Sequence, residues 1–285
     1  MVSFDDWLAE LIAQAHLPTD FGAVAKQVCS PLLSRIQDAR RGPGYLVGLC
    51  GAQGSGKSTL SLVLAEMLRR AGRSVAVLSL DDLYLTRAQR QGLASDVHPL
   101  LATRGVPGTH DIALGTQVIS ALSGVGSVAL PRFDKALDDR VPQSDWPVVQ
   151  GPVDVILLEG WCVGARAQAA QDLIPPINEL ERLEDPELVW RSYVNQALVG
   201  PYRAVFDRLD LLVLLAAPSF DVVLAWRQEQ EAKLRARVAD TGHVMSDEAV
   251  VRFVAHYERI TRWILQDMPG RADIVIRLNA QRRSL

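Results

Sequence analysis

Residues 51–58 read Gly-Ala-Gln-Gly-Ser-Gly-Lys-Ser and match the G-x-x-x-x-G-K-[ST] pattern of a phosphate-binding loop. An apolar run at 45–50 precedes the motif and a helical pattern over 57–71 follows it, which is the strand–loop–helix setting that the pattern requires. The glycines allow the backbone to wrap a phosphate chain with its N–H groups pointing inward. The sequence therefore predicts a nucleoside triphosphate site.

The last residues of the motif carry its chemistry. Lys57 is expected to reach the β- and γ-phosphates, and the hydroxyl of Ser58 is placed to hold a magnesium ion. The alternative is a glycine-rich turn that only starts a helix, and the Lys-Ser ending argues against it. The predicted nucleotide contacts in this segment are Gly51, Ala52, Gln53, Gly54, Ser55, Gly56, Lys57, Ser58 and Thr59.

Carboxylates follow two further apolar runs. The run at 74–80 ends in Asp81 and Asp82, and the run at 153–158 ends in Glu159. Ligands of open α/β sheets bind beyond the carboxyl ends of the strands, and phosphoryl transfer needs a base and a magnesium contact there. A solvated turn or a helix cap is the alternative for Asp81, and Asp82 is the second candidate for the base. The predicted catalytic residues are Asp81, Lys57 and Glu159, and the predicted metal ligands are Ser58, Asp81 and Glu159.

Strands and helices alternate along most of the chain. Continuous Val/Ile/Leu runs predict a parallel sheet covered on both faces. The predicted strands are 45–50, 74–80, 153–158, 209–215 and 273–278, with a possible extra strand at 127–131; the predicted helices are 57–71, 110–123, 187–206, 219–238 and 246–267. The predicted fold is a three-layer α/β/α P-loop NTPase with a mostly parallel five-stranded sheet and a helical lid.

The domain prediction separates a helical extension at 1–42 from a P-loop kinase domain at 43–285, whose lid covers about 224–245. A helical pattern runs from about 20 to 40, and Pro31 is expected to break or kink it. The role of the first forty residues and the oligomeric state stay open.

Composition limits the class of protein. The chain has 285 residues, of which 48% are hydrophobic and 22% charged, as is usual for a globular protein. Its net charge of −3 argues against a broad nucleic-acid surface. Three scattered cysteines indicate a reducing compartment, and the longest apolar run is too short to cross a bilayer. We therefore expect a cytoplasmic protein without membrane or nucleic-acid partners.

Two long loops, at 81–109 and 131–152, carry basic side chains toward the phosphate site. Arginine forks pair with carboxylates, so Arg104 and Arg132, with His110 and Lys135, favour an anionic acceptor. The alternative is a set of solvated charges paired with nearby aspartates, and His110 could belong to a helix cap. Arg227, on the predicted helix at 219–238, is the candidate to bring positive charge onto the nucleotide from a lid.

Several blocks together resemble the plant and fungal type of D-glycerate 3-kinase, in the phosphoribulokinase, uridine kinase and pantothenate kinase branch of P-loop kinases. They are the phosphate loop, Ser79-Leu-Asp-Asp-Leu-Tyr-Leu85, Gly108-Thr-His-Asp111, Pro131-Arg-Phe-Asp-Lys135 and Leu158-Glu-Gly-Trp161. The resemblance covers about residues 44 to 268 and implies ATP and Mg²⁺ as cofactors, with Asp81 as the base. The acceptor contacts predicted in the two long loops are Asp82, Tyr84, Arg104, His110, Asp111, Arg132, Asp134 and Lys135.

The function that follows is an ATP-dependent kinase for a hydroxyl of a small organic acid, with D-glycerate to 3-phosphoglycerate as the expected reaction. A uridine- or pantothenate-type kinase is one alternative. A nucleotide-dependent regulatory protein is another, although the chain has no Asn-Lys-x-Asp motif for reading guanine. The exact acceptor stays open.

Overall fold

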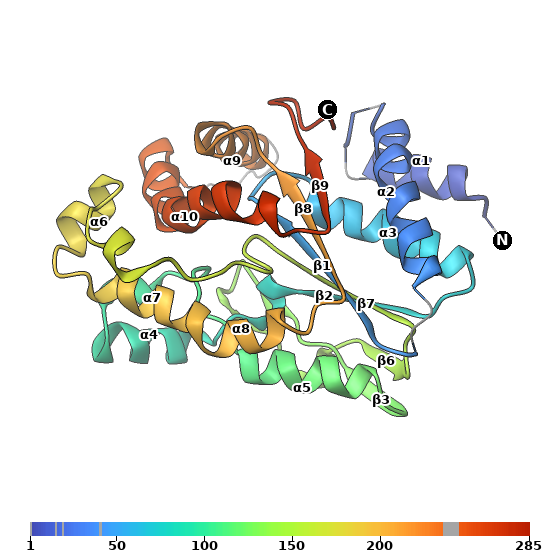
Figure 1. Ribbon diagram of the computed structural model, residues 1–285, viewed down its shortest axis with the longest axis horizontal. Coiled ribbons are helices and arrows are strands. Elements are labelled where there is room, and N and C mark those ends of the chain that lie inside the picture. Colours follow the sequence, from blue (N-terminus) through green and yellow to red (C-terminus); the bar gives the residue numbers. More distant parts are fainter. Residues whose placement is uncertain (1, 15, 19, 40–41, 236–244) are drawn as a thin grey trace.

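The computed structural model describes residues 2–14, 16–18, 20–39, 42–235 and 245–285. Within this part, the centre is a five-stranded parallel sheet in the order β2-β7-β1-β8-β9 (Figure 1). Its strands are β1 (Tyr45–Gly51), β2 (Val75–Ser79), β7 (Val155–Gly160), β8 (Leu211–Ala216) and β9 (Ile274–Arg277). All five predicted strands are present, and the predicted fold class is confirmed.

Helices cover both faces of this sheet and give three layers (Figure 1). One face carries α1 (Phe4–Gln14), α2 (Phe21–Asp38), α3 (Lys57–Arg70) and α9 (Phe220–Arg235). The other face carries α5 (Ile112–Leu122), α7 (Val189–Val199) and α8 (Pro201–Phe206). Helix α10 (Asp247–Asp267) contributes apolar residues to both cores.

Alternate residues of each strand enter the two cores, which explains the uninterrupted apolar runs. In β1, Leu46 and Cys50 belong to one core and Val47 and Leu49 to the other, and all four are buried. The strand register determines the position of Glu159, which lies on β7 directly between Ser79 on β2 and Leu49 on β1. Three strand ends that are far apart in the sequence therefore meet at one edge.

Short elements occur in and between the two long predicted loops and before α7; apart from β3, the sequence pattern did not show them. These are α4 (Arg87–Asp96), α6 (Glu179–Glu184), an antiparallel pair of β3 (Gly126–Ala129) with β6 (Val148–Gly151), and a hairpin of β4 (Phe133–Asp134) with β5 (Asp139–Arg140). The possible strand at 127–131 is β3, and it lies outside the main sheet.

One helix prediction is wrong, and of the break or kink expected at Pro31 the break is not found. The single helix predicted over 187–206 is two helices, because Pro201 starts α8 at a position where its missing N–H is not needed. Helix α2 continues through Pro31 without a break. Cys29 and Leu32, on either side of Pro31, are both fully buried in one core, and this packing compensates for the lost backbone hydrogen bond.

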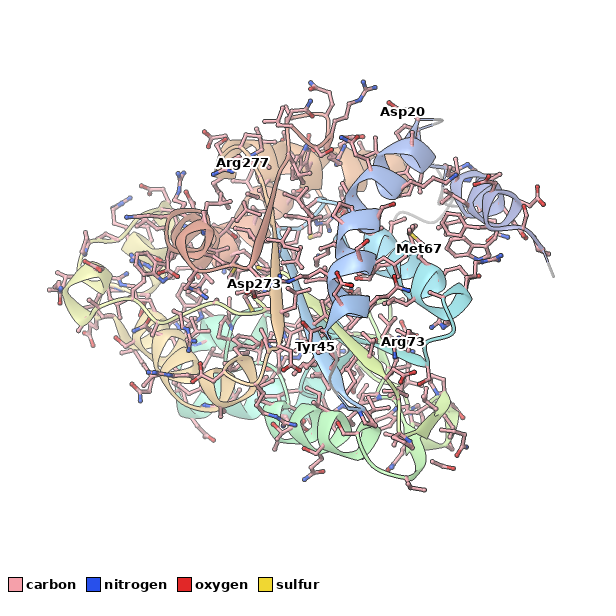
Figure 2. All side chains as sticks on the ribbon, turned by 45° about the vertical axis from the view of Figure 1, so that its right-hand side comes forward. Asp20, Tyr45, Met67, Arg73, Asp273 and Arg277 are labelled. Atoms are coloured by element: carbon pink, nitrogen blue, oxygen red, sulfur yellow. The ribbon has the colours of Figure 1, made fainter. Side chains whose placement is uncertain are left out.

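The first two helices share a core with the sheet. Leu8 of α1 and Leu32 and Ile36 of α2 are buried together with Leu64 of α3 and with inward residues of β1. Figure 2 shows α1 and α2 beside α3 on one face of the sheet. None of the described helices is long and apolar enough to cross a membrane. Of the predicted lid at 224–245, residues 236–244 lie outside the described residues.

Candidate phosphate-binding and acceptor site

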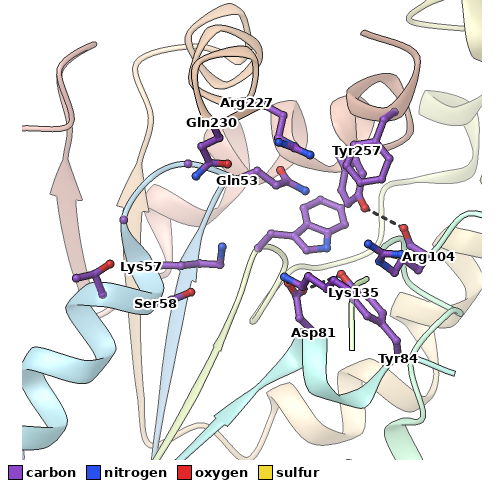
Figure 3. Close-up of a pocket in the computed structure, with 15 residues that line it drawn as sticks. Gln53, Lys57, Ser58, Asp81, Tyr84, Arg104, Lys135, Arg227, Gln230 and Tyr257 are labelled. Atoms are coloured by element: carbon purple, nitrogen blue, oxygen red, sulfur yellow. Dashed lines mark hydrogen bonds and ion pairs between the residues drawn. The ribbon is translucent and has the colours of Figure 1, made fainter. Parts of the chain in front are cut away.

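A cavity of about 310 Å³ opens beside the phosphate loop, at the carboxyl ends of the parallel strands (Figure 3). Figure 3 shows Lys57 and Ser58 on one side of it and Asp81, Tyr84 and Arg104 on the other. The described lining residues are Gln53, Gly54, Gly56, Lys57, Ser58, Thr59, Asp81, Tyr84, Arg104, Lys135, Trp161, Arg227, Gln230, Phe253 and Tyr257. Six of the nine nucleotide contacts predicted in the motif and three of the eight predicted acceptor residues therefore face a common space.

The phosphate loop connects β1 to α3, and Gly56 directly precedes the first helical residue, Lys57. Gly54 and Gly56 have φ angles of +77° and +86°, in the left-handed region that favours glycine. A Cβ at Gly54 would lie 2.8 Å from the Cβ of Trp226, so a side chain has no room there. Backbone N–H groups at the start of α3, with the helix dipole behind them, form an anion site.

Ser58 and Glu159 form the candidate magnesium site. The Ser58 hydroxyl donates to Glu159 Oε1 over 3.0 Å, and the carboxylate is 5% exposed. Among the described residues, Glu159 Oε2 has no hydrogen-bond partner although it is buried. A buried carboxylate oxygen without a donor suits a cation, and Mg²⁺ is usually held by one or two carboxylates together with substrate phosphates. These two residues therefore fit a magnesium ion.

Asp81 points into the cavity and is held from two sides. Tyr84 donates its hydroxyl to Oδ1 over 2.8 Å, and the Lys135 ammonium donates to Oδ2 over 2.6 Å. Burial alone would raise the pKa of Asp81, but Lys135 and then Lys57 outweigh it and lower the pKa to about 2. The helix-cap alternative does not apply, because the side chain of Ser79 caps the turn that contains Asp81. Asp81 is therefore an ionised carboxylate that faces the phosphate loop.

Asp82, the second candidate for the base, turns away from the cavity. Its Oδ2 accepts from Arg132 over 3.2 Å and its Oδ1 accepts from the backbone N–H of Phe133 over 3.1 Å. Burial raises the pKa of Asp82, the opposite direction from that of its neighbour. In the described chain, Asp82 and Arg132 lie outside the cavity lining, and together they attach the segment around residue 133 to the end of β2.

Tyr84, Arg104 and Lys135 form the acceptor side of the cavity. Arg104 pairs with Asp138 and lies 5.6 Å above the ring of Phe133. Lys135 follows the two residues of β4, so the β4–β5 hairpin presents it to Asp81. The two basic side chains come from different loops, as the sequence predicted, and lie over one cavity.

The other predicted acceptor residues support the walls instead. His110 is 5% exposed and pairs with Tyr202, and burial lowers its pKa to about 3, so it is neutral and gives no charge to an anion. Asp111 caps α5 by accepting from the N–H of Leu114, as the cap alternative proposed. Asp134 accepts from the N–H of Ala136 inside the hairpin turn. In the described chain, all three lie outside the cavity lining.

Aromatic residues complete the lining, and the sequence reasoning did not assign them to the site. Trp161 donates its indole N–H to Gly105 O over 2.8 Å, and its ring meets that of Tyr257 edge-on at 4.9 Å. Gly105 has a φ of +126°, and a Cβ there would collide with the Tyr257 hydroxyl. Trp161 lies two residues after Glu159, and this short spacing could have placed it at the site. Phe253 and Tyr257, four residues apart on α10, cannot be distinguished from core residues by spacing alone.

Arg227 lines the cavity from α9, as predicted for a lid residue, and Gln230 joins it one turn later. The Arg227 guanidinium pairs with Glu231 over 2.7 Å and lies 5.7 Å from the ring of Phe253. Its side chain is 18% exposed. Arg227 is therefore held over the phosphate loop by a buried carboxylate and an aromatic face. Trp226, the residue before Arg227, is buried.

The chain is similar to known kinases over most of its length. It is 34% identical over 232 residues to the "uncharacterized kinase mug58" of Schizosaccharomyces pombe, covering 78% of this chain and 81% of that protein. It is 33% identical over 235 residues to the chloroplastic D-glycerate 3-kinase of Arabidopsis thaliana, covering 79% of this chain and 48% of that protein. The chain thus spans about half the length of the plant relative.

Structural similarity agrees with the sequence comparison. The D-glycerate 3-kinase of Cryptococcus neoformans superposes with a TM-score of 0.76 at 27% identity, covering 92% of this chain and 98% of that structure. A family model described as the methylmalonyl-CoA mutase-associated GTPase MeaB matches residues 19–85, a segment that contains the phosphate loop.

The fold and the site define a P-loop kinase, an enzyme that transfers a phosphoryl group to an alcohol acceptor. Within that class, the chain belongs to the family that includes the plant and fungal D-glycerate 3-kinases. The family that its sequence motifs resemble is therefore confirmed.

Proposed function

We propose that this protein uses ATP and Mg²⁺ to phosphorylate a hydroxyl of D-glycerate, giving 3-phosphoglycerate. The observation that carries the proposal is the cavity itself, in which the ionised Asp81 carboxylate faces the phosphate loop across a space of about 310 Å³. The named glycerate kinases among its relatives supply the candidate acceptor.

The charge of the lining favours an acidic acceptor. Among the described lining residues, Asp81 is the one carboxylate. Four are cationic: Lys57, Arg104, Lys135 and Arg227. Lys57 and Arg227 lie beside the phosphate loop, where the triphosphate neutralises them. Arg104 and Lys135 remain for the acceptor. A guanidinium has five N–H donors, so Arg104 can bind a carboxylate while it keeps its contact with Asp138.

Asp81 is placed to act as the base. As the acceptor oxygen forms its bond to the γ-phosphorus, the bond to the ADP oxygen breaks and the hydroxyl proton passes to Asp81. A carboxylate with a low pKa is a weak base, and its ion pair with Lys135 is one cause of the low value. An acceptor carboxylate that draws Lys135 toward itself would weaken this pair and make Asp81 more basic. In this way acceptor binding would activate the base.

The remaining residues stabilise charge and exclude water. Lys57 and Arg227 both line the cavity. Lys57 would contact the β- and γ-phosphates, and Arg227 would bring positive charge to the transferred group from α9. Ser58 and Glu159 would hold magnesium, which would supply charge neutralisation for the phosphates. Trp161, Phe253 and Tyr257 form an apolar wall that lowers water access beside Asp81.

A coupled assay of ADP release tests the proposal. Purified protein is given ATP, Mg²⁺ and, in separate reactions, D-glycerate, L-glycerate, uridine and pantothenate, and ³¹P NMR identifies the product. We expect turnover with D-glycerate and a phosphate ester at its 3-hydroxyl. Turnover with uridine or pantothenate in place of glycerate would overturn the acceptor assignment. ATP hydrolysis that no acceptor accelerates would favour the regulatory alternative.

A further inference from the structure

The chain ends in a closed turn beside the phosphate loop. After β9, the Asn279 N–H donates to Arg283 O over 2.8 Å. The Asn279 side chain accepts from the N–H groups of Gln281 and Arg283 over 2.9 and 3.0 Å. These bonds fix residues 279–283 as a compact turn, which we call the C-terminal turn.

Arg282 lies in this turn with a φ of +65°, in the left-handed region that residues other than glycine rarely adopt. Its Nε donates to the carbonyl of Gly54 over 2.7 Å, and its Nη2 donates to Glu229 Oε2 over 2.7 Å. The guanidinium also lies 5.2 Å from the ring of Trp226. An unfavourable backbone conformation is thus held by three side-chain contacts, and strain of this kind occurs often at functional sites.

The contact joins three segments that are distant in the sequence. Trp226 of α9 donates its indole N–H to Ala280 O over 2.7 Å, so α9 is attached to the C-terminal turn twice. Gly54 packs so tightly on Trp226 that no Cβ fits between them. The same helix carries Arg227 and Gln230 into the cavity. One arginine therefore ties the phosphate-loop backbone to the helix that supplies Arg227.

We propose that Arg282 is a positioning residue for the nucleotide. It fixes the Gly54 carbonyl, and with it the neighbouring amides of the phosphate loop, and keeps α9 in register with that loop before the triphosphate arrives. In the described chain, Arg282 lies outside the cavity lining, so it acts through Gly54 and α9 rather than by touching the substrate. Pre-ordering a loop in its bound conformation strengthens binding because less entropy is lost on association.

The inference rests on the nucleotide binding of the proposed function and is independent of the acceptor. Arg282→Ala removes both hydrogen bonds, whereas Arg282→Lys keeps the charge and the stem over Trp226 but cannot reach Gly54 O and Glu229 together. Arg283→Ala is the matched control, because the neighbouring arginine has the same chemistry, is 61% exposed and pairs with Asp20.

The dissociation constant of a non-hydrolysable ATP analogue is measured with Mg²⁺ by titration calorimetry, together with steady-state kinetics. We expect Arg282→Ala to weaken analogue binding and raise KM for ATP about tenfold, with KM for the acceptor unchanged. Arg282→Lys should recover about half of that loss on a logarithmic scale. Arg283→Ala should bind as the wild type does, and its apo melting temperature should stay within about 2 °C of the wild type.

Equal nucleotide affinity in Arg282→Ala and Arg283→Ala would overturn the inference. So would a loss confined to the melting temperature of Arg282→Ala, or a kcat that falls while KM for ATP is unchanged. If Arg282→Ala does not fold, Arg282→Lys decides alone, and wild-type affinity in that variant would overturn the inference. A wild-type protein that binds no ATP analogue would instead overturn the proposed function, and the role of Arg282 with it.

Discussion

The two halves of the cavity are built by different means. The cradle of the phosphate half is one continuous segment, residues 51–59, whose backbone N–H groups are aimed by the turn and by α3. Arg227 and Gln230 of α9 lie beside it in the cavity lining. The acceptor half consists of side chains from separate segments: Asp81 and Tyr84 after β2, Arg104 from the following loop, Lys135 from the β4–β5 hairpin and Tyr257 from α10. The first half is a local structure, and the second exists only after the whole chain has folded.

Because of this difference, the two halves respond differently to changes in the surrounding structure. A backbone cradle depends on glycines and on one strand–helix connection, so it keeps its function while the surface around it varies. A cavity made of side chains from four segments changes its ligand when any one segment shifts. Within one fold, the phosphate half therefore defines the reaction and the acceptor half defines the substrate.

The phosphate half should be the more sensitive to a single change. We expect Lys57→Ala to lower kcat about 10³-fold, because one fixed positive charge on the transferred phosphates is lost from a site shielded from water. ADP release measures the effect. Lys26→Ala, an exposed lysine on α2, is the control and should behave as the wild type does. A Lys57→Ala enzyme that retains most of its turnover would remove the phosphate loop from catalysis.

Asp81→Asn tests the junction of the two halves. The amide keeps the size of the side chain but cannot accept the acceptor proton, so kcat should fall about 10²- to 10³-fold. The dissociation constant for ATP, measured by calorimetry, should change by less than about threefold, since Asp81 faces the acceptor. A near-normal kcat would exclude Asp81 as the base.

Lys135→Met tests whether Lys135 lowers the pKa of Asp81, binds the acceptor, or does both. Removing the ammonium leaves burial as the larger effect, so the pKa of Asp81 should rise from about 2. Since ionised Asp81 is the active form, the fall of kcat/KM on the acid side should move to higher pH. The wild type should stay flat from about pH 8 down to about pH 5 in a pH–rate profile, if Asp81 is the group that titrates. Lys135→Arg should keep the wild-type profile.

Loss of the charge should also raise KM for glycerate about tenfold in Lys135→Met. An unchanged KM in that variant would mean that Lys135 serves the base alone. An unchanged acid limb together with a raised KM would mean the reverse, that it serves the acceptor alone.

Asp82→Ala should have the smallest effect on turnover and a clear effect on stability. The substitution leaves Arg132 without its carboxylate partner and the Phe133 N–H without an acceptor, which should cost about 1–3 kcal/mol in the free energy of unfolding. Urea denaturation measures this loss, and kcat should stay within about threefold of the wild type at a temperature where the variant is folded. A collapse of kcat in a stable Asp82→Ala enzyme would assign the base role to Asp82.

The sequence was sufficient for the parts that depend on local patterns. The five strands, the phosphate loop and the position of Asp81 and Glu159 at one edge of the sheet follow from apolar runs and from the rule that parallel strands end at one edge. The different positions of Asp81 and Asp82, one in the cavity and one outside it, could not be predicted from the sequence. The two residues are adjacent, and only the conformation of the turn decides which side chain enters the cavity. His110 illustrates the same limit, since its neutral state depends on burial beside Tyr202, 92 residues away.

Helices α1 and α2 have a practical consequence for work on this protein. Because Leu8, Leu32 and Ile36 share a core with Leu64 of α3, a shortened chain that starts near residue 43 would expose an apolar stripe on the helix that follows the phosphate loop. Such a fragment should be prone to aggregation in a bacterial expression host. Purification handles are better appended ahead of residue 1 than used to replace these helices.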